Sequence, residues 1–259
     1  METGNTNYHF KDVTLLVTHY NRSKSLERLL KTFKEQNCSF EAIVVSDDGS
    51  AAEHQQALEE LKTTYGFQLI TTPVNKGLGN NINKGQDAVK TPYTLYVQED
   101  FVPTPQFAAH LPDAVGFMRE ENDLDIVRFY AYRAYPYLEP YKKGFSRMVV
   151  KPWFTNYKKV YYYSDHPHLR RSSFLTKFGR YVEGEKVDKT EYAMCVSFIK
   201  HRGKGLFYND FQGLFVQKNS SNEPSTWQYK SWRQSKNPLV TYARDIYRQV
   251  KYNYDMYLS

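Results

Sequence analysis

Cysteine is scarce in this sequence, which has only Cys38 and Cys195 in 259 residues. Two cysteines exclude a disulfide framework, and they exclude a metal site built from paired Cys-x-x-Cys motifs. Each falls in or beside a stretch with helical character. We therefore expect two buried free thiols.

Long apolar runs are also missing. No run approaches the roughly 18 apolar residues that a membrane-spanning helix needs. The N-terminal METGNTNYHFKD lacks the apolar segment of a secretory signal. These absences predict a cytoplasmic protein, and they leave open a peripheral position on the inner face of a membrane.

Tyrosine and positive charge are what the sequence has in excess. There are 23 tyrosines, and the net charge is +7. Tyrosine suits half-buried surfaces that meet sugars, nucleobases or a membrane interface. The charge favours an anionic partner, although a well-solvated basic surface explains it equally. The basic residues are scattered and no nucleic-acid motif is present, so no nucleic-acid partner is expected.

The first half of the chain alternates strands and helices. Apolar β-branched runs predict buried strands at residues 13–17, 42–45, 67–71 and 93–97, and helical spacing joins Leu26, Leu29, Leu30 and Phe33, then Ala57, Leu58 and Leu61. Ser23 or Ser25 is the expected cap of the first helix. Such alternation predicts a parallel sheet wound by right-handed crossovers.

Polar residues follow each of these strands. His19-Tyr20-Asn21, Asp47-Asp48, Asn75-Lys76-Gly77 and Glu99-Asp100 stand at four successive strand ends. In parallel sheets the ligand lies beyond the carboxyl ends of the strands. Core packing alone does not explain polar residues at all four ends.

The second half is less regular. Residues 130–163 are crowded with Tyr and Pro, which predicts long loops with one or two antiparallel strands. A helix is expected at residues 190–200, and a last one from Pro238 to Leu258. The last helix carries apolar residues along one side, and we expect this side to pack on the domain or on a second subunit. An anionic membrane surface is the alternative.

The acid pair Glu99-Asp100 suits a divalent metal. A departing diphosphate is stabilised by Mg²⁺ or Mn²⁺, and these hard cations prefer carboxylate ligands. Taken alone, the pair fits equally well a solvated turn or a cap of the helix that begins near Pro105.

Five segments in a fixed order point to a family. They are VTLLVTHYN at residues 13–21, SDDGS at 46–50, Asn75-Lys76-Gly77, Asn83-Lys84-Gly85, and Glu99-Asp100 before Phe101-Val102-Pro103. This order resembles the nucleotide-binding half of family 2 glycosyltransferases, closely over residues 10–110 and more loosely over 165–210. The resemblance implies the GT-A fold: a Rossmann-like, mixed and mostly parallel α/β sheet flanked by helices, with an irregular acceptor-side half and a C-terminal helix.

The resemblance also implies an activity. It is the transfer, with inversion, of a sugar from a nucleotide-diphosphate sugar to a hydroxyl of a glycan or lipid-linked acceptor, by a hexosyltransferase-like enzyme of bacterial cell-surface polysaccharide or lipopolysaccharide synthesis. We expect a single domain over residues 1–259. It would comprise a donor half at 10–110, an acceptor and catalytic half at 111–225 and a helical extension at 226–259. An oligomer formed through that last helix is left open.

The roles implied for single residues follow the motifs. Nucleotide-sugar contacts are expected from Thr18, Tyr20, Asn21, Asp47, Asp48, Asn75, Gly77, Asn83 and Glu99, and the divalent metal, Mn²⁺ or Mg²⁺, is expected on Asp100. The chain departs from the family pattern at three of these motifs. Ile82 replaces an arginine, Gln98 replaces the first acid of an EDD motif, and Gln217 or Lys218 stands where a histidine often completes the metal site.

A general base must take the proton of the acceptor hydroxyl. The family places this acid at the start of a helix, which makes Glu191 the first candidate here and Asp188 the second. Both also suit a helix N-terminus simply because the helix dipole favours acids there.

Two other segments are open to more than one interpretation. His166-Pro167-His168 lacks a third metal ligand, so a loop contact is the expected role. Arg170 and Arg171 are expected either to meet a phosphate or to face water.

Two other functions compete with sugar transfer. A nucleotidyltransferase also binds a nucleotide on an α/β sheet, but His19-Tyr20-Asn21-Arg22 lacks the glycines of its phosphate loop. A decayed, non-catalytic relative that still binds nucleotide sugars is the other alternative, because the family's usual histidine and arginine are missing, and so is the second acid of its ED pair, where Tyr192 stands here.

Overall fold

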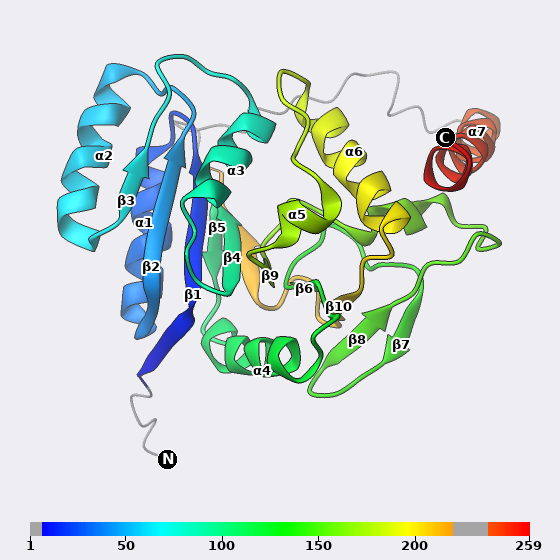
Figure 1. Ribbon diagram of the computed structural model, residues 1–259, viewed down its shortest axis with the longest axis horizontal. Coiled ribbons are helices and arrows are strands. Elements are labelled where there is room, and N and C mark those ends of the chain that lie inside the picture. Colours follow the sequence, from blue (N-terminus) through cyan, green and yellow to red (C-terminus); the bar gives the residue numbers. More distant parts are fainter. Residues whose placement is uncertain (1–6, 220–237) are drawn as a thin grey trace.

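The computed structural model describes residues 7–219 and 238–259. Its helices lie on both faces of a central sheet (Figure 1). They are α1 (Ser23–Glu35), α2 (Ala52–Tyr65), α3 (Leu78–Asp87), α4 (Phe107–Glu120), α5 (Phe174–Phe178), α6 (Val187–Lys200) and α7 (Pro238–Tyr257), with a 3₁₀ helix, η1, at Tyr157–Tyr162.

The strands of the described residues form one sheet of nine, in the order β3-β2-β1-β4-β9-β6-β10-β8-β7, and a ribbon of two, β11-β5. Their bounds are β1 (Tyr8–His19), β2 (Cys38–Asp47), β3 (Gln68–Ile70), β4 (Tyr93–Gln98), β5 (Phe101–Pro103), β6 (Ile126–Arg128), β7 (Leu138–Pro140), β8 (Phe145–Met148), β9 (His168–Arg171), β10 (Gly205–Tyr208) and β11 (Phe215–Gln217). Strands β3, β2, β1 and β4 are parallel, and β9 joins them in the antiparallel sense. The predicted mixed, mostly parallel α/β sheet is confirmed.

The strands expected in the first half are all present. Strand β1 is buried on both faces from Val13 to His19, as its unbroken β-branched run predicts. Helix α1 buries Leu26, Leu29 and Phe33 on one side. The serine cap predicted for α1 is wrong.

Helix α1 begins at Ser23 behind Arg22, and no side chain caps it. The two serines have other partners. The Ser23 hydroxyl bonds the His54 ring at 2.9 Å, and Ser25 Oγ accepts a hydrogen bond from Arg28. Both serines lie inside the first turn, so neither side chain is placed to cap it.

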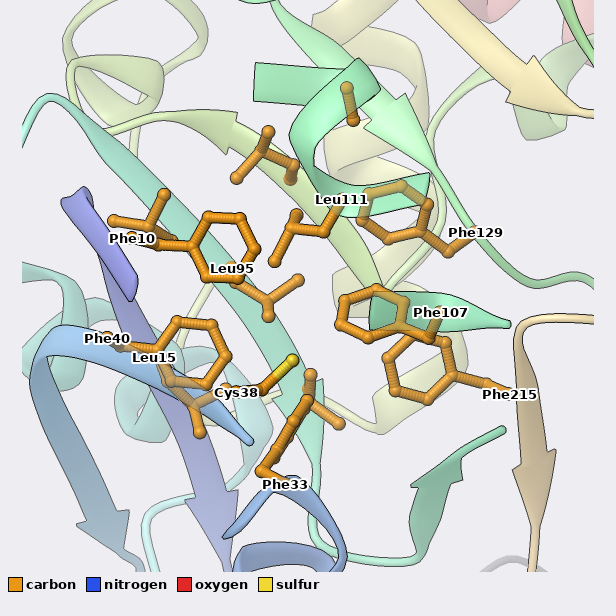
Figure 2. Close-up of a cluster of buried hydrophobic side chains, with 14 of the residues drawn as sticks. Phe10, Leu15, Phe33, Cys38, Phe40, Leu95, Phe107, Leu111, Phe129 and Phe215 are labelled. Carbon is orange, nitrogen blue, oxygen red and sulfur yellow. The ribbon is translucent and has the colours of Figure 1, made fainter. Parts of the chain in front are cut away.

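One hydrophobic core lies between the sheet and helices α1 and α4. Phe33 from α1 and Phe107 from α4 meet with ring centroids 5.8 Å apart. Figure 2 shows these rings with Leu15 and Leu95 from the sheet and Phe215 from β11. This core fixes the relative positions of β1, β4 and the β5–β11 ribbon, and with them the acids that follow β4.

A second core lies on the opposite side of the sheet, under α6 and η1. It contains Tyr96, Tyr163, Phe174 and Phe198, all fully buried. The predicted helix at residues 190–200 is confirmed within α6. Many of the surplus tyrosines and phenylalanines of the sequence are used here.

Helix α7 is present as predicted, but it faces the other way. Its apolar residues Tyr242, Ile246 and Val250 are 70%, 48% and 66% exposed. The domain is met by the opposite side, where Arg248 donates to Tyr157 Oη, Gln249 donates to the Phe154 carbonyl and Met256 is buried in the second core. The apolar side therefore does not pack on the domain, and its packing on a second subunit stays a prediction.

Several smaller expectations are also settled. Cys38 and Cys195 are both free and buried, as predicted. Among the residues that the structure describes, no helix is long and apolar enough to cross a membrane. The boundary expected between residues 225 and 226 lies outside the described residues.

Candidate functional site

The carboxyl ends of β1 and β2 are joined by a buried hydrogen bond. His19 ends β1 and Asp47 ends β2, and their Nδ1 and Oδ1 atoms lie 2.8 Å apart. The other ring nitrogen of His19 accepts the backbone N–H of Arg22 at 3.2 Å. His19 thereby ties the turn after β1 to the turn after β2.

Asp47 also organises the SDDGS turn. Ser50 donates its backbone N–H to Asp47 Oδ2 at 3.0 Å and its hydroxyl to Oδ1. Burial would raise the pKa of Asp47, but the hydrogen bonds from His19 and Ser50 outweigh it, so the pKa lies below its ordinary value. Asp47 is therefore ionised at neutral pH.

Asn21 completes the contact between these two turns. Its backbone N–H donates to Ser50 Oγ and its side-chain oxygen accepts the N–H of Ala51, both at 2.8 Å. Asn21 has a φ of 52°, a left-handed conformation in which Asn is among the better-tolerated residues. The Tyr-Asn sequence thus turns the chain sharply at the end of β1.

Asp48 holds the third loop in place. Its two carboxylate oxygens accept the backbone N–H groups of Lys76 and Gly77 at 2.9 and 2.8 Å. A Cβ on Gly49 would lie 2.5 Å from the Val74 carbonyl carbon, so only glycine fits where the two loops touch. The segment from Asn75 to Gly77 is thereby fixed beside Asp47.

The acids after β4 face Arg22. Its Nη1 lies 3.1 Å from Asp100 Oδ2 and 3.5 Å from Glu99 Oε1, and all three side chains are nearly buried. Arg22 Nη2 also donates to Asn219. Burial raises the pKa of Glu99 to about 8, and the charge of Asp100 adds to the rise. One guanidinium therefore sits against two acids that repel each other.

One carboxylate oxygen of Asp100 could accept a further positive partner. It is 4% exposed, and its Oδ1 atom has no hydrogen-bond partner in the described part of the chain. Gln217 lies beside it and donates its amide to Oδ2 at 2.8 Å, in the region where the resemblance places a histidine. Across residues 7–219 and 238–259, no three His, Cys, Asp or Glu side chains gather into a metal site.

Two predicted nucleotide contacts have other partners. Thr18 is buried, and its hydroxyl bonds Tyr96 Oη at 3.1 Å. Asn83 is buried with its amide bonded to both backbone groups of Tyr181 and to the Glu183 carboxylate. We therefore assign Asn83 to the packing of α3 rather than to donor contact. Tyr20 is half-buried beside this edge.

The two candidate bases lie one turn apart on α6. Glu191 is half-buried and turns towards the segment before β9, where its Oε1 accepts the Ser164 hydroxyl at 3.0 Å. Asp188 is in the first turn of α6. A line of contacts leads from Glu191 back to Asp100.

That line runs through four side chains from three segments. Ser164 Oγ bonds the His166 ring at 2.9 Å, and the His166 and Tyr132 rings meet edge-on with centroids 4.5 Å apart. Tyr132 donates to Gln217, which donates to Asp100, each at 2.8 Å. A chain of side-chain contacts therefore connects Glu191 with Asp100.

The loop contact expected for the His-Pro-His segment is confirmed. His166 packs its ring against Phe101, Tyr130 and Tyr132. Burial lowers the pKa of His166 to about 3, so the ring is neutral. His168 is fully buried on β9.

The expectation for Arg170 is wrong. Arg170 is fully buried between the rings of Tyr96, Phe174 and Tyr181, so it does not face water. Arg171 is half-buried and donates to the carbonyls of Met118, Glu121 and Leu124.

Four residues of the site were missed by pattern reasoning. The signal for His19 and Arg22 was their position at the end of the first predicted strand. The signal for Lys84, which donates to the Asp47 carbonyl, was its place in an NKG motif. Burial lowers the pKa of Lys84. Asp165, buried beside Glu191, carried no signal beyond its place before His166.

Comparisons with known proteins agree with this geometry. The model of a family described as glycosyl transferase family 2 matches residues 14–179, more than half of the chain. No curated protein matches the sequence.

Among solved structures, residues 1–349 of TarS from S. aureus in complex with UDP-GlcNAc match with a TM-score of 0.63 and 15% identity, over 94% of this chain and 72% of that one. A mannosyltransferase from Pyrobaculum calidifontis in complex with GDP-Man and Mn²⁺ matches with a TM-score of 0.57 and 14% identity, over 93% of this chain and 64% of that one. The longer TarS chain is covered to only 37%. At these identities the likeness shows the fold, and it confirms the expected GT-A architecture.

Proposed function

The chain belongs to glycosyl transferase family 2, and we propose that it transfers a sugar from a nucleoside-diphosphate sugar to an acceptor hydroxyl with inversion. The observation that carries the proposal is the meeting of three strand ends. Asp47 after β2, Arg22 after β1 and Asp100 after β4 are linked by the contacts of His19 and by the ion pairs of Arg22. A nucleotide bound there would contact all three turns.

We assign the donor nucleotide to the first half of the chain, residues 10–110. Asp47 is ionised and can accept from a base N–H. We assign the base to the ring of Tyr20, and the ribose and diphosphate to the Asn75–Gly77 loop, which Asp48 holds. Asp48 acts through this loop, because both of its oxygens are already used on it.

A divalent cation, Mn²⁺ or Mg²⁺, fits at Asp100. The buried Oδ1 without a hydrogen-bond partner is the atom that would hold it, with Glu99 and Gln217 beside it. When bound, such a cation would stabilise the charge of the departing diphosphate. With one carboxylate available, phosphate and water oxygens would supply most of its ligands. Arg22 already brings one positive charge to the same place.

We assign the general base to Glu191, with Asp188 as the second candidate. As the acceptor oxygen bonds to the anomeric carbon, the bond from that carbon to the diphosphate oxygen breaks and its electron pair leaves with the diphosphate. The proton of the acceptor hydroxyl passes to the Glu191 carboxylate. Attack from the face opposite the leaving group inverts the anomeric carbon.

The acceptor is proposed to be a glycan or a lipid-linked sugar of a bacterial cell-surface polysaccharide, and the sugar moved a hexose. The second half, residues 111–225, would bind it. The outward apolar side of α7 is where a second subunit or a membrane surface would be met. These proposals rest on the family and on the arrangement of the two halves.

Nucleotide binding tests the proposal without an acceptor. UDP, GDP, ADP and CDP are added with and without Mn²⁺, and the thermal unfolding midpoint is recorded. We expect one nucleotide to stabilise selectively, by about 2.7 kcal/mol at a hundred times its dissociation constant. If no nucleoside diphosphate raises the midpoint, donor binding is refuted.

The variant Asp100→Asn tests the cation site in the same assay. We expect it to lose the Mn²⁺-dependent part of the stabilisation, because a neutral amide is a poor ligand for a hard cation. Asp87→Asn is the control, since Asp87 is exposed and paired with Arg180. An unchanged Mn²⁺ effect in Asp100→Asn would remove Asp100 from the cation site.

A further inference from the structure

Asp165 is a buried acid that the donor site does not use. It lies between η1 and β9 and is 4% exposed. Tyr163 donates its hydroxyl to Oδ1 at 2.8 Å, whereas Oδ2 is buried with no hydrogen-bond partner among the described residues. A buried carboxylate oxygen without a donor is unfavourable, so this atom is the natural place for a proton.

Glu191 lies directly against Asp165. Its Oε1 atom accepts the backbone N–H of Asp165 at 3.2 Å and the Ser164 hydroxyl at 3.0 Å. This backbone contact makes the two acids neighbours, and the charge on one carboxylate disfavours ionisation of the other. Burial raises the pKa of Asp165 to about 8, and the charge of Glu191 adds to the rise.

The groups that face this pair in the described part of the chain come from seven segments, one of which is η1, where the charge of Glu191 helps to raise the pKa of Tyr161. Around Asp165 they are Tyr163 beside it, Tyr96 on β4, Arg170 on β9, Tyr181 after α5, and Cys195 with Glu191 on α6; Arg128 on β6 faces Glu191. Two of them are buried guanidiniums, and the tyrosines and the thiol are neutral because burial raises their pKa values.

A chain of hydroxyl groups links Asp165 to one of these cations. Arg170 Nη1 donates to Tyr181 Oη at 2.6 Å, the hydroxyls of Tyr181 and Tyr163 are hydrogen-bonded, and Tyr163 donates to Asp165. A fully buried guanidinium needs a negative charge nearby. The acid pair supplies that charge even while it keeps one proton.

The other end of the pair points to the donor site. Through Ser164, His166, Tyr132 and Gln217, Glu191 is connected to Asp100. Glu191 is the half-buried member and Asp165 the buried one. An acceptor that reaches the site would therefore meet Glu191, with Asp165 behind it.

We propose that Asp165 and Glu191 share one proton and form the proton-accepting pair of the transfer reaction, an inference that rests on the proposed function. Glu191 receives the proton of the acceptor hydroxyl as the new glycosidic bond forms and the diphosphate departs. Asp165 is a positioning residue. Its N–H orients Glu191, and its charge when ionised makes Glu191 a stronger base.

The shared proton is tested by infrared spectroscopy of the carboxyl C=O stretch between about pH 5 and about pH 10. The spectra are recorded in a Glu99→Gln background, because burial also raises the pKa of Glu99 to about 8. In that background we expect a protonated-carboxyl band that is lost near pH 8. Asp165→Asn removes it. Glu191→Gln moves its loss to lower pH, because the neighbouring charge is gone. Tyr163→Phe moves it to higher pH, because the hydrogen bond from Tyr163 lowers the pKa of Asp165.

These shifts in opposite directions distinguish a proton-sharing pair from a buried acid that only stabilises the fold of the segment before β9. A band that persists in Asp165→Asn, or that ignores the loss of Glu191, overturns the proposal. Tyr163→Phe keeps the test valid if the Asp165 variant fails to fold, because it leaves both acids in place.

The catalytic role is tested with UDP-GlcNAc and GDP-mannose in Mn²⁺, with water as acceptor and release of nucleoside diphosphate as the readout. We expect the wild-type rate to rise through a step near pH 8, and Asp165→Asn to lose the step and run roughly tenfold slower above it. The nucleotide-induced thermal shift stays unchanged in the variant.

The two possible failures are distinguishable. If no nucleoside diphosphate stabilises the wild type, the proposed function fails, and the infrared band alone then decides whether the pair exists. If the wild type turns over a donor and Asp165→Asn keeps the same pH profile, the pair has no catalytic role and the proposed function stands.

Discussion

The two sides of the central sheet place their polar residues differently. Around β1, β2 and β4 the polar side chains lie at the ends of strands, and their partners are loop backbones, as with Asp48 and the N–H groups of Lys76 and Gly77. Around β9 and α6 they lie inside an aromatic core, as Arg170 does between Tyr96 and Phe174.

We infer that this difference separates binding from proton transfer. The acids at the strand ends, although buried, hold the loops that a charged ligand would contact. Acids and guanidiniums buried among rings have shifted pKa values and fixed positions, which suits a group that must gain and lose a proton. We expect substitutions on the first side to change nucleotide binding, and on the second to change turnover or folding.

The largest expected effect tests that division directly. Glu191→Gln removes the proton acceptor, so release of nucleoside diphosphate should slow by about 10²- to 10⁴-fold while nucleotide-induced stabilisation is kept. Glu185→Gln is the control, because Glu185 is an exposed acid paired with Lys189 just before α6. If Asp188→Asn rather than Glu191→Gln abolished turnover, the base would be reassigned to Asp188.

The next effect concerns the buried guanidinium. Arg170→Met should lower the free energy of unfolding by about 3–5 kcal/mol, because it strips partners from Tyr181, Gln86 and the Asp165 side of the core. Urea denaturation measures it. Arg180→Met, which breaks only an exposed ion pair with Asp87, should cost about 0–1 kcal/mol. Equal losses would contradict the comparison.

The smallest effect lies at the seam between the two sides. Helix α3 meets the segment after α5 at Gly79, where a Cβ would lie 2.1 Å from the Val182 carbonyl oxygen. Gly79→Ala should therefore cost about 1–3 kcal/mol in the free energy of unfolding. Gly116→Ala in α4 meets no atom within 4 Å and should be neutral or stabilising. If Gly79→Ala left the free energy of unfolding unchanged, the contact between α3 and the segment after α5 would have to adjust without cost.

The first side could be predicted from sequence because its signals are local. Buried parallel strands are continuous apolar runs, and the turn residues after them, such as Asp47 and Asp48, follow at once. What the pattern could not give was the pairing across turns. That His19 bonds Asp47 and that Arg22 faces Asp100 depends on strand order, which brings β2, β1 and β4 together.

The second side could not be predicted in the same way. The sequence predicts a surface or phosphate-binding role for Arg170, because arginine is rarely buried. The three rings that enclose Arg170 come from other elements, and no neighbouring residue in the sequence indicates them. Asp165 is set by contacts with α6, 26 residues further along the chain. The packing of helix α7 could not be predicted for a related reason. Its apolar stripe predicts that this side is covered, but the pattern does not show which surface covers it.

The scarcity of cysteine gives each side its own natural probe. Cys38 begins β2 and Cys195 lies in α6, and burial raises the pKa of the first to about 12 and that of the second well above its ordinary value. An alkylating reagent will therefore leave the native protein unmodified and will label each thiol only when its surroundings open. Mass spectrometry of the labelled peptides would therefore give the rate of local opening around Cys38 and around Cys195 separately, without an engineered label.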